Sequence, residues 1–218
     1  MSTLRISVLI SGGGTNLEAL IDSIRQQAIP ARVVQVISSD PKAYGLERAR
    51  NHGIPVQTLP ADLQLQHGMD SLEQQEKLLL DWLEEAETDL VVLAGYLKKI
   101  PDRVLRAYPN KIMNIHPSLV PAFSGPGWYG MKVHEGVWRR GAKITGATVH
   151  FVNEEMDGGP IVLQEAVYLD DEDDPAAISQ KVLAVEHRLL PQAVALFTEG
   201  KLRVEQHRVY LKKAGNQL

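Results

Sequence analysis

Near its N-terminus the chain reads Ile6-Ser7-Val8-Leu9-Ile10-Ser11-Gly12-Gly13-Gly14-Thr15-Asn16-Leu17. The apolar run predicts a buried strand, the glycines predict a tight loop, and Thr15 followed by Glu18 fits a capping box that places a helix start at Thr15. A strand, a glycine loop and a helix in this order bring free backbone N–H groups together, as phosphate sites require. Leu17 stands where the dinucleotide fingerprint has its third glycine, so phosphate binding and a purely structural turn both stay open.

Apolar runs and amphipathic stretches alternate through the next hundred residues. Further strands are predicted over 33–38, 56–59, 90–94 and 111–115, and helices over 15–24, 44–52, 70–85 and 101–107. This alternation is typical of right-handed βαβ units. We therefore predict an α/β fold, with a Rossmann-like, mostly parallel twisted sheet that has helices on both faces.

The pattern changes after residue 141. Two long strand-like runs, 144–152 and 161–169, are joined by a short loop and predict an antiparallel hairpin at the edge of the sheet. Apolar residues at helical spacing predict a last helix from about Ile178 to Leu196, which Pro191 is expected to kink or break. No linker or repeat interrupts the chain, so residues 1–218 are predicted to form a single domain.

Composition narrows the function classes. Apolar residues make up 44% and charged residues 23% of the 218 residues, which is typical of a globular protein, and the net charge of -4 gives no footprint for nucleic acid. The absence of cysteine excludes disulfides and thiolate chemistry. No apolar run has the length of a membrane span and no signal-peptide pattern is present, so the expected location is cytoplasmic.

A metal site is not expected. The histidines show no metal-ligand spacing, His52 and His67 look like surface loop residues, and His150 and His187 lie within a strand and on a helix flank. The acidic run 170–174 is interpreted as a solvated loop before a helix, with a metal site as the minor alternative.

Polar side chains gather where the fifth predicted strand ends. This segment reads Met113-Asn114-Ile115-His116-Pro117, and strand alternation puts Asn114 and His116 on one side. Ligands bind at the carboxyl ends of parallel strands. An amide donor beside an imidazole suits a developing oxyanion and supplies a group that carries protons.

The hairpin loop supplies a carboxylate. It reads Asn153-Glu154-Glu155-Met156-Asp157-Gly158-Gly159-Pro160, and its glycines allow a backbone path that exposes Asp157. A carboxylate near His116 would raise the pKa of that imidazole and favour imidazolium. From the residues alone, a strand-end histidine and a turn aspartate also have structural readings, and the catalytic reading remains one alternative.

Several segments together resemble the folate-dependent formyltransferase family, in particular its members that act on glycinamide ribonucleotide in purine biosynthesis. The resemblance runs from about residue 5 to about residue 210. The matching segments are Val8–Leu17, Gly45–Ala49, Val91–Tyr96, Asn114–Leu119, Val149–Val152, Asp157–Pro160 and Glu186–His187.

The resemblance implies that the amine of glycinamide ribonucleotide attacks the formyl carbon of 10-formyltetrahydrofolate, a co-substrate. Asn114 and protonated His116 would stabilise the oxyanion, and Asp157 would hold His116 and relay the amine proton through water. The implied binding residues for the ribonucleotide are Gly14, Thr15 and Asn16 for its phosphate and Glu186 for its glycinamide end. Those for folate are Leu97, Lys98, Lys99, Ile100, Asn114, Asn153, Glu154, Glu155, Met156 and Asp157. A homodimer is plausible within the family.

The chain departs from the family pattern in three places. The helix expected at 70–85 begins without the basic residue that often reaches into the site, the loop Phe123–Met131 is longer than in many members, and Glu18 replaces an uncharged residue.

Rival readings remain. A transfer-RNA formyltransferase would need an extra C-terminal nucleic-acid-binding domain. A formyltetrahydrofolate hydrolase would carry an extra N-terminal regulatory domain. A sugar-amine formyltransferase has a compatible length. A non-catalytic nucleotide-binding module would use the glycine loop alone.

Overall fold

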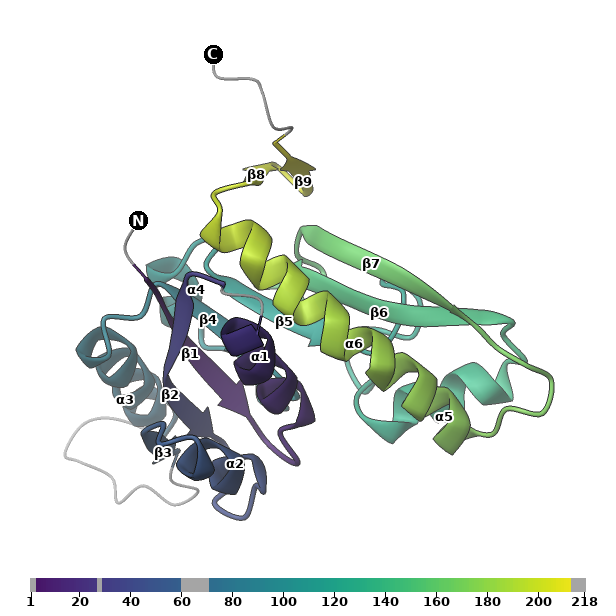
Figure 1. The fold of residues 1–218 in the computed structure, drawn as a ribbon, viewed down its shortest axis with the longest axis horizontal. Coiled ribbons are helices and arrows are strands. Elements are labelled where there is room, and N and C mark those ends of the chain that lie inside the picture. The colour runs from purple at the N-terminus through teal and green to yellow at the C-terminus, as the bar shows by residue number, and fades with distance from the viewer. Residues whose placement is uncertain (1–2, 27–28, 60–70, 213–218) are drawn as a thin grey trace.

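The computed structural model describes residues 3–26, 29–59 and 71–212, and its core is one twisted sheet with helices on both faces (Figure 1). The strands are β1 Leu4–Ile10, β2 Ala31–Ser38, β3 Val56–Thr58, β4 Leu90–Leu93, β5 Ile112–His116, β6 Ile144–Phe151, β7 Ile161–Tyr168, β8 Leu202–Glu205 and β9 Arg208–Leu211. The helices are α1 Thr15–Gln26, α2 Gly45–Asn51, α3 Ser71–Glu85, α4 Asp102–Ala107, α5 Met131–Arg139 and α6 Pro175–Thr198. Among these helices, none is both long and apolar enough to cross a membrane.

The strand order creates a crevice at the centre of the sheet. The order is β3-β2-β1-β4-β5-β6-β7-β9-β8, and the first five strands in this order are parallel. The chain moves outward from β1 to β3, then returns to the other side of β1 with β4. Ligands bind at such a switch point, outside the carboxyl ends of the strands. The glycine loop follows β1, and Asn114 and His116 end β5, so both open toward the same edge.

Two apolar layers hold the helices on the sheet. Helices α1, α2, α5 and α6 contribute to the core on one face, and α3 and α4 to the core on the other. Val8 and Val92 face the first layer, whereas Leu9 and Val91 face the second, because side chains alternate along a strand. Parallel strands buried on both faces read as continuous apolar runs, which explains the pattern in the sequence.

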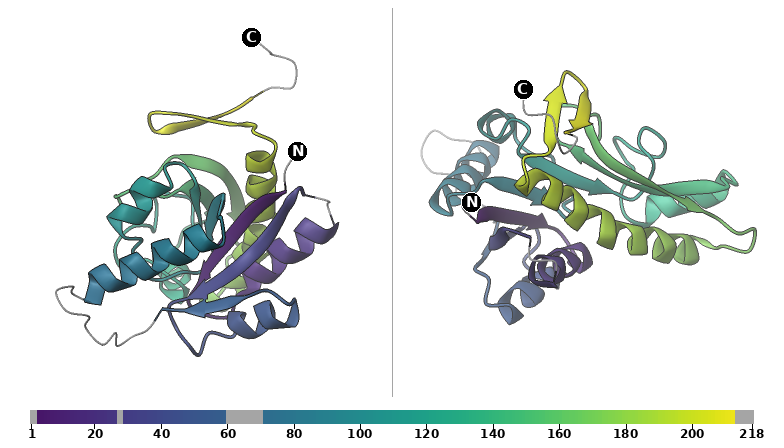
Figure 2. Two further views of the ribbon diagram at one scale, coloured as in Figure 1. Left: turned by 90° about the vertical axis from the view of Figure 1, so that its left-hand side faces the viewer. Right: turned by 45° about the horizontal axis from the view of Figure 1, so that its top comes forward.

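The predicted antiparallel hairpin is present as β6 and β7. It pairs with β5 through β6, and a further short hairpin continues the sheet beyond β7, where Ile161 pairs with Arg208 of β9. The yellow strands β8 and β9 lie beside one end of β7 in the right-hand view of Figure 2. The sequence analysis did not predict them because each has only four residues with partly exposed side chains.

Two helices differ from the prediction. Helix α6 continues through Pro191 without a break, because the proline is buried with much of one helix face and that packing outweighs one lost backbone hydrogen bond. Helix α5 was not predicted at all. It begins directly after Gly130, a residue with positive φ, and only the spacing of Val133 and Val137 indicates it. Asp70, where the third helix was expected to begin, lies outside the described residues.

Close packing between β6 and β7 requires glycine at position 146. A Cβ atom there would lie 2.1 Å from the Glu165 carbonyl oxygen and 2.8 Å from Leu119 Cδ2. We expect Gly146→Ala to lower the free energy of unfolding by about 1–3 kcal/mol, as overpacking does. The measurement is the urea midpoint, with Gly13→Ala as the control because no atom lies within 4 Å of its added Cβ. Equal midpoints for the two variants would contradict this packing argument.

Candidate active site

A cavity of about 640 Å³ opens at the carboxyl ends of the parallel strands. Its walls come from the loops after β1 and β4, the end of β5, the loop after β6, and helices α5 and α6. The predicted catalytic residues Asn114, His116 and Asp157 all line it. The structure therefore brings together three side chains that are up to 43 positions apart in the sequence (157 − 114).

A buried histidine orients the Asn114 amide. Asn114 lies opposite His150 in the β5–β6 pairing, and its Nδ2 is 3.1 Å from His150 Nε2. His150 Nδ1 is 2.9 Å from the Phe151 carbonyl oxygen, to which it donates. The unprotonated Nε2 can then accept a hydrogen bond from the Asn114 amide. Nδ2 of Asn114 is therefore the amide atom that faces His150. The second N–H of the amide remains for a ligand.

His116 is held by a backbone carbonyl on one side and faces a carboxylate on the other. Its Nε2 donates to the Phe123 carbonyl oxygen at 2.9 Å, and its Nδ1 lies 3.5 Å from Asp157 Oδ2. Burial lowers the pKa of His116, and this effect exceeds the opposing effects of Asp157 and of the Phe123 carbonyl. The sign predicted for the Asp157 effect is confirmed. The net direction, which we expected to favour imidazolium, was wrong because desolvation was left out.

Asp157 is fixed by three contacts. Gly125 N–H donates to Oδ2 at 2.8 Å, His116 Nδ1 lies 3.5 Å from the same oxygen, and His150 Nε2 lies 3.6 Å from Oδ1, while the backbone φ is 56°. Burial raises the pKa of Asp157, but the charge of His116 and the Gly125 N–H lower it, and the net pKa lies below the usual value. The side chain is 12% exposed, less than predicted, yet it reaches the cavity rather than the strand ladder. Gly159 permits this path, since a Cβ there would lie 1.8 Å from the Phe151 carbonyl oxygen.

The long loop from Phe123 to Met131 supplies the contacts that position both ionisable groups. It carries the Phe123 carbonyl to His116 and the Gly125 N–H to Asp157. The Trp128 ring anchors the loop, because it packs edge-on against Phe123 with ring centroids 5.5 Å apart and covers Gly136 of α5. We expected this loop to be longer than in many family members, and in this chain it is part of the site.

The glycine loop lies at the rim of the cavity. Ser11, Gly12 and Asn16 line it, whereas Gly14 and Thr15 do not. Gly14 packs on α2 instead, since its Cβ would lie 2.6 Å from Gly45 Cα, so its lack of a side chain already has a structural reason. The helix starts at Thr15 as predicted, but Glu18 forms no capping box.

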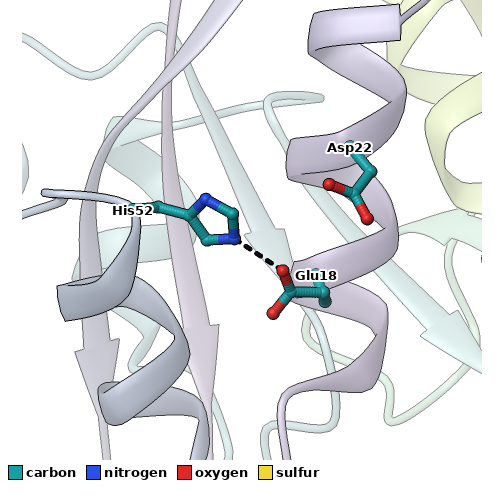
Figure 3. Close-up of side chains that lie close together, drawn as sticks. All are labelled: Glu18, Asp22 and His52. Carbon is teal, nitrogen blue, oxygen red and sulfur yellow. Dashed lines mark hydrogen bonds and ion pairs between the residues drawn. The ribbon is translucent and has the colours of Figure 1, made fainter.

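The Glu18 carboxylate is used elsewhere. It pairs with Arg48 at 3.1 Å. It also pairs with His52 (Figure 3), so His52 is not a free loop residue. Arg48 also donates to the Gly13 carbonyl oxygen at 2.9 Å, which ties α2 to the glycine loop. The negative charge of Glu18 is thus balanced by Arg48.

Glu18, Asp22 and His52 are also the one group of potential metal ligands within the described residues, with ligand atoms that lie within 4.8 Å of one another (Figure 3). None of the three lines the active-site cavity. His67 and most of the segment where a basic residue was expected lie outside the described residues.

Asn16 and Glu186 form a buried polar pair on the helical wall. Asn16 Nδ2 donates to Glu186 Oε2 at 2.7 Å, and Asn16 Oδ1 is buried without a partner. Burial raises the pKa of Glu186 to about 7, although the Asn16 hydrogen bond lowers it. This pair can therefore exchange a proton near neutral pH and has hydrogen-bonding capacity left for a ligand.

The loops 97–100 and 153–157 form a second wall of the cavity. All the residues assigned to folate line the cavity, namely Leu97, Lys98, Lys99, Ile100, Asn114, Asn153, Glu154, Glu155, Met156 and Asp157. Burial raises the pKa of the neighbouring Tyr96 to about 12, which keeps its phenol neutral. Leu97 N–H donates to Ser11 Oγ at 2.8 Å, so this wall is linked to the glycine loop.

Sequence reasoning missed two histidines of the site. His150 was interpreted as a strand residue only. Its pairing with Asn114 depends on the register of β5 against β6, which the sequence does not show. His134 was not singled out, although it lines the cavity from α5 and is 5% exposed.

Comparison with known proteins places the chain among enzymes of formyl transfer. The formyl transferase family model matches residues 4–194. A phosphoribosylglycinamide formyltransferase of Haemophilus influenzae is 38% identical over 207 residues, with 95% of this chain and 93% of that protein covered. Glycinamide ribonucleotide transformylase 1 of Symbiobacterium toebii superposes with a TM-score of 0.87 at 42% identity, over 97% of this chain and 95% of that one.

A formyltetrahydrofolate deformylase of Pseudomonas syringae is also similar in structure. Its TM-score is 0.85 at 25% identity, and the match covers 97% of this chain and 67% of that one. The shared part is the domain that holds the cavity described above. From the family match, the identity to its relatives and the shared fold, we conclude that the chain belongs to the formyl transferase family.

Proposed function

We propose that this chain transfers a formyl group from 10-formyltetrahydrofolate to the primary amine of glycinamide ribonucleotide, in the synthesis of purines. The single observation that carries the proposal is the joint placement of Asn114, His116 and Asp157 in one cavity, which Asn16 and Glu186 also line. Relatives that cover nearly the whole chain carry this activity in their names. Formyltetrahydrofolate is the co-substrate of the family.

The reaction exchanges one C–N bond for another. The ribonucleotide amine attacks the formyl carbon, the carbonyl oxygen becomes an oxyanion, and the bond from carbon to the folate nitrogen then breaks. The amine loses one proton and the folate nitrogen gains one. The free N–H of Asn114 supplies a preoriented donor for the oxyanion.

His116 and Asp157 carry out the transfer of the amine proton. Because Nε2 of His116 donates to the Phe123 carbonyl, Nδ1 is the nitrogen that can accept a proton. Protonation there places an N–H between the ring and Asp157, which stabilises the imidazolium as charge develops. A neutral resting imidazole, as burial favours, can thus take up the amine proton and return it to the leaving nitrogen.

The binding assignments follow the two walls. Glu186 and Asn16 hold the glycinamide end, the glycine loop with Gly14, Thr15 and Asn16 holds the phosphate, and the loops 97–100 and 153–157 hold folate. Gly14 and Thr15 do not line the cavity, so they would contribute backbone N–H groups from its rim. Arg48 beside the Gly13 carbonyl supports the anion site by charge.

The remaining proposals concern partners and location. We expect a single domain over residues 1–218 that needs no metal and no nucleic acid, in keeping with the net charge of -4. A homodimer and a cytoplasmic location also remain predictions. A similar phosphoribosylglycinamide formyltransferase of Arabidopsis thaliana is described by its name as chloroplastic.

One assay separates the candidate functions. The protein is incubated with 10-formyltetrahydrofolate and with glycinamide ribonucleotide, an amino sugar nucleotide or no amine, and deformylated folate is measured. Turnover with the ribonucleotide alone supports the proposal. Turnover without amine indicates a hydrolase such as the deformylase, and nucleotide binding without turnover indicates a non-catalytic module.

Asn114→Ala should lower turnover by roughly 10²–10³-fold, because it removes a preoriented oxyanion donor. His116→Ala should cost at least as much. The double change Asn114→Ala with Asp157→Asn should cost less than the product of the single changes, since the residues act as a unit. Turnover at saturating substrates is the measurement, and full multiplicativity would show that the residues act independently.

Asp157→Asn should shift the titration of His116 to lower pH. The wild-type carboxylate raises the pKa of His116 against the effect of burial, so its loss leaves only the Phe123 carbonyl to oppose that effect. The pKa is followed by NMR of the imidazole ring, together with turnover against pH. Asp171→Asn, a change at an exposed carboxylate, is the control. An unshifted titration with near-full turnover would make Asp157 a turn residue only.

Glu186→Gln should alter the pH dependence of stability. The folded-state pKa of about 7 exceeds the usual value of about 4.3, so the folded protein binds the proton more tightly than the unfolded chain. Wild-type stability from this group is present below pH 4 and is lost as the pH rises toward 7. The variant should lack this loss and gain relative stability above pH 7, as measured by urea unfolding. Parallel curves would contradict the raised pKa.

A further inference from the structure

His134 is a buried polar side chain in the active-site cavity to which the mechanism above gives no role. It lies on α5, which packs against α6 (Figure 1), and it lines the cavity together with Asn16, Ser179 and Glu186. Its exposed fraction is 5%. Because α5 packs on α6, the helix that carries Glu186, we assign His134 to the part of the cavity that binds the ribonucleotide.

The ring of His134 has no hydrogen-bond partner in the protein. Nδ1 is buried and unpartnered, one of four such atoms among the described residues. No hydrogen bond to Nε2 is present in the structure either, and because His134 lines the cavity, Nε2 is the ring nitrogen left to face it. Buried polar groups in proteins are nearly always paired, and an unmade hydrogen bond carries the full desolvation cost. A purely structural histidine at this position would therefore be a poor choice compared with an apolar residue.

The charge state and tautomer follow from this environment. Burial, and after it the charge of His116, lowers the pKa of His134 to about 4, so the ring is neutral near pH 7. A neutral ring has one N–H. An orphaned buried N–H is the rarer defect, so the proton belongs on Nε2 and the bare lone pair on Nδ1. His134 thus presents an uncharged N–H donor to the cavity.

We infer that His134 is a substrate-positioning residue, which donates a hydrogen bond from Nε2 to an uncharged oxygen of the ribonucleotide amine, its amide carbonyl or a ribose oxygen. This rests on the proposed function. A phosphate is a poor match, because a dianion would favour imidazolium in a position that disfavours charge. With Asn16 and Glu186, the contact fixes the glycinamide end so that its amine faces the formyl carbon.

The test compares His134→Leu, which removes the donor at similar volume, with His134→Gln, whose amide can place an N–H near the position of Nε2. Calorimetry measures the Kd of glycinamide ribonucleotide, and kinetics measure KM for both substrates. We expect the leucine variant to raise Kd and KM for the ribonucleotide about tenfold, as loss of one hydrogen bond does, with KM for the folate unchanged. The glutamine variant should recover most of this loss.

Stability without ligand distinguishes a binding role from a structural one. The leucine variant should have an unchanged or higher Tm, because it replaces an unsatisfied polar group by an apolar one. Thr145→Val is the matched control, since Thr145 Oγ1 is also buried and unpartnered but does not line the cavity. It should raise or preserve Tm and leave Kd unchanged.

The possible failures are distinguishable. A wild-type protein that neither binds nor formylates the ribonucleotide would overturn the proposed function itself. If the wild type is active and His134→Leu keeps the wild-type Kd, or loses Tm and affinity for both substrates alike, the inference about His134 is overturned and the proposed function stands.

Discussion

The register of β5 against β6 is the constraint on which the site depends. It sets Asn114 opposite His150 and His116 opposite Thr148, at the point where the sheet changes from parallel to antiparallel. The loop after β6 leaves the sheet near the start of β5, where Phe151 pairs with Met113, and folds back so that Asp157 reaches His116 and His150. A shift of one residue would turn Asn114 and His116 to the other face of the sheet and separate both from Asp157.

The contacts around these residues come largely from backbone groups. The Phe123 carbonyl holds His116, the Gly125 N–H holds Asp157, and the Phe151 carbonyl sets the tautomer of His150. Backbone dipoles keep their positions while the side chains change protonation, which makes the site preorganised for charge that develops during reaction. The loop 123–131 provides the contacts from Phe123 and Gly125. It is held in place by the packing of Trp128 on α5 rather than by secondary structure.

Burial is the largest single influence on the pKa values of these ionisable groups in the cavity. Burial lowers the pKa of His116 and His134 and raises that of Glu186, while Asp157 remains below its usual pKa because its contacts outweigh burial. One carboxylate is therefore firmly ionised and the other titrates near neutrality. Environments that separate the pKa values of similar groups are typical of sites for acid–base chemistry.

Local patterns in the sequence determined the order and type of most elements. The alternation of apolar runs and amphipathic stretches predicts the parallel sheet. The strand-end motif and the turn before Gly158 indicate Asn114, His116 and Asp157 as candidates for the site. These features depend on a few neighbouring residues, whose periodicity and turn chemistry are visible in one dimension.

Tertiary structure alone decided the remaining features. The path of α6 through Pro191, the pairing of Glu18 with Arg48 and the packing of Gly14 on Gly45 each depend on a partner distant in sequence. The same holds for the net pKa of His116, which the sequence suggested with the wrong sign. The charge beside the ring could be guessed from a motif, but the loss of water around it arises only when loop, helix and sheet close over the site.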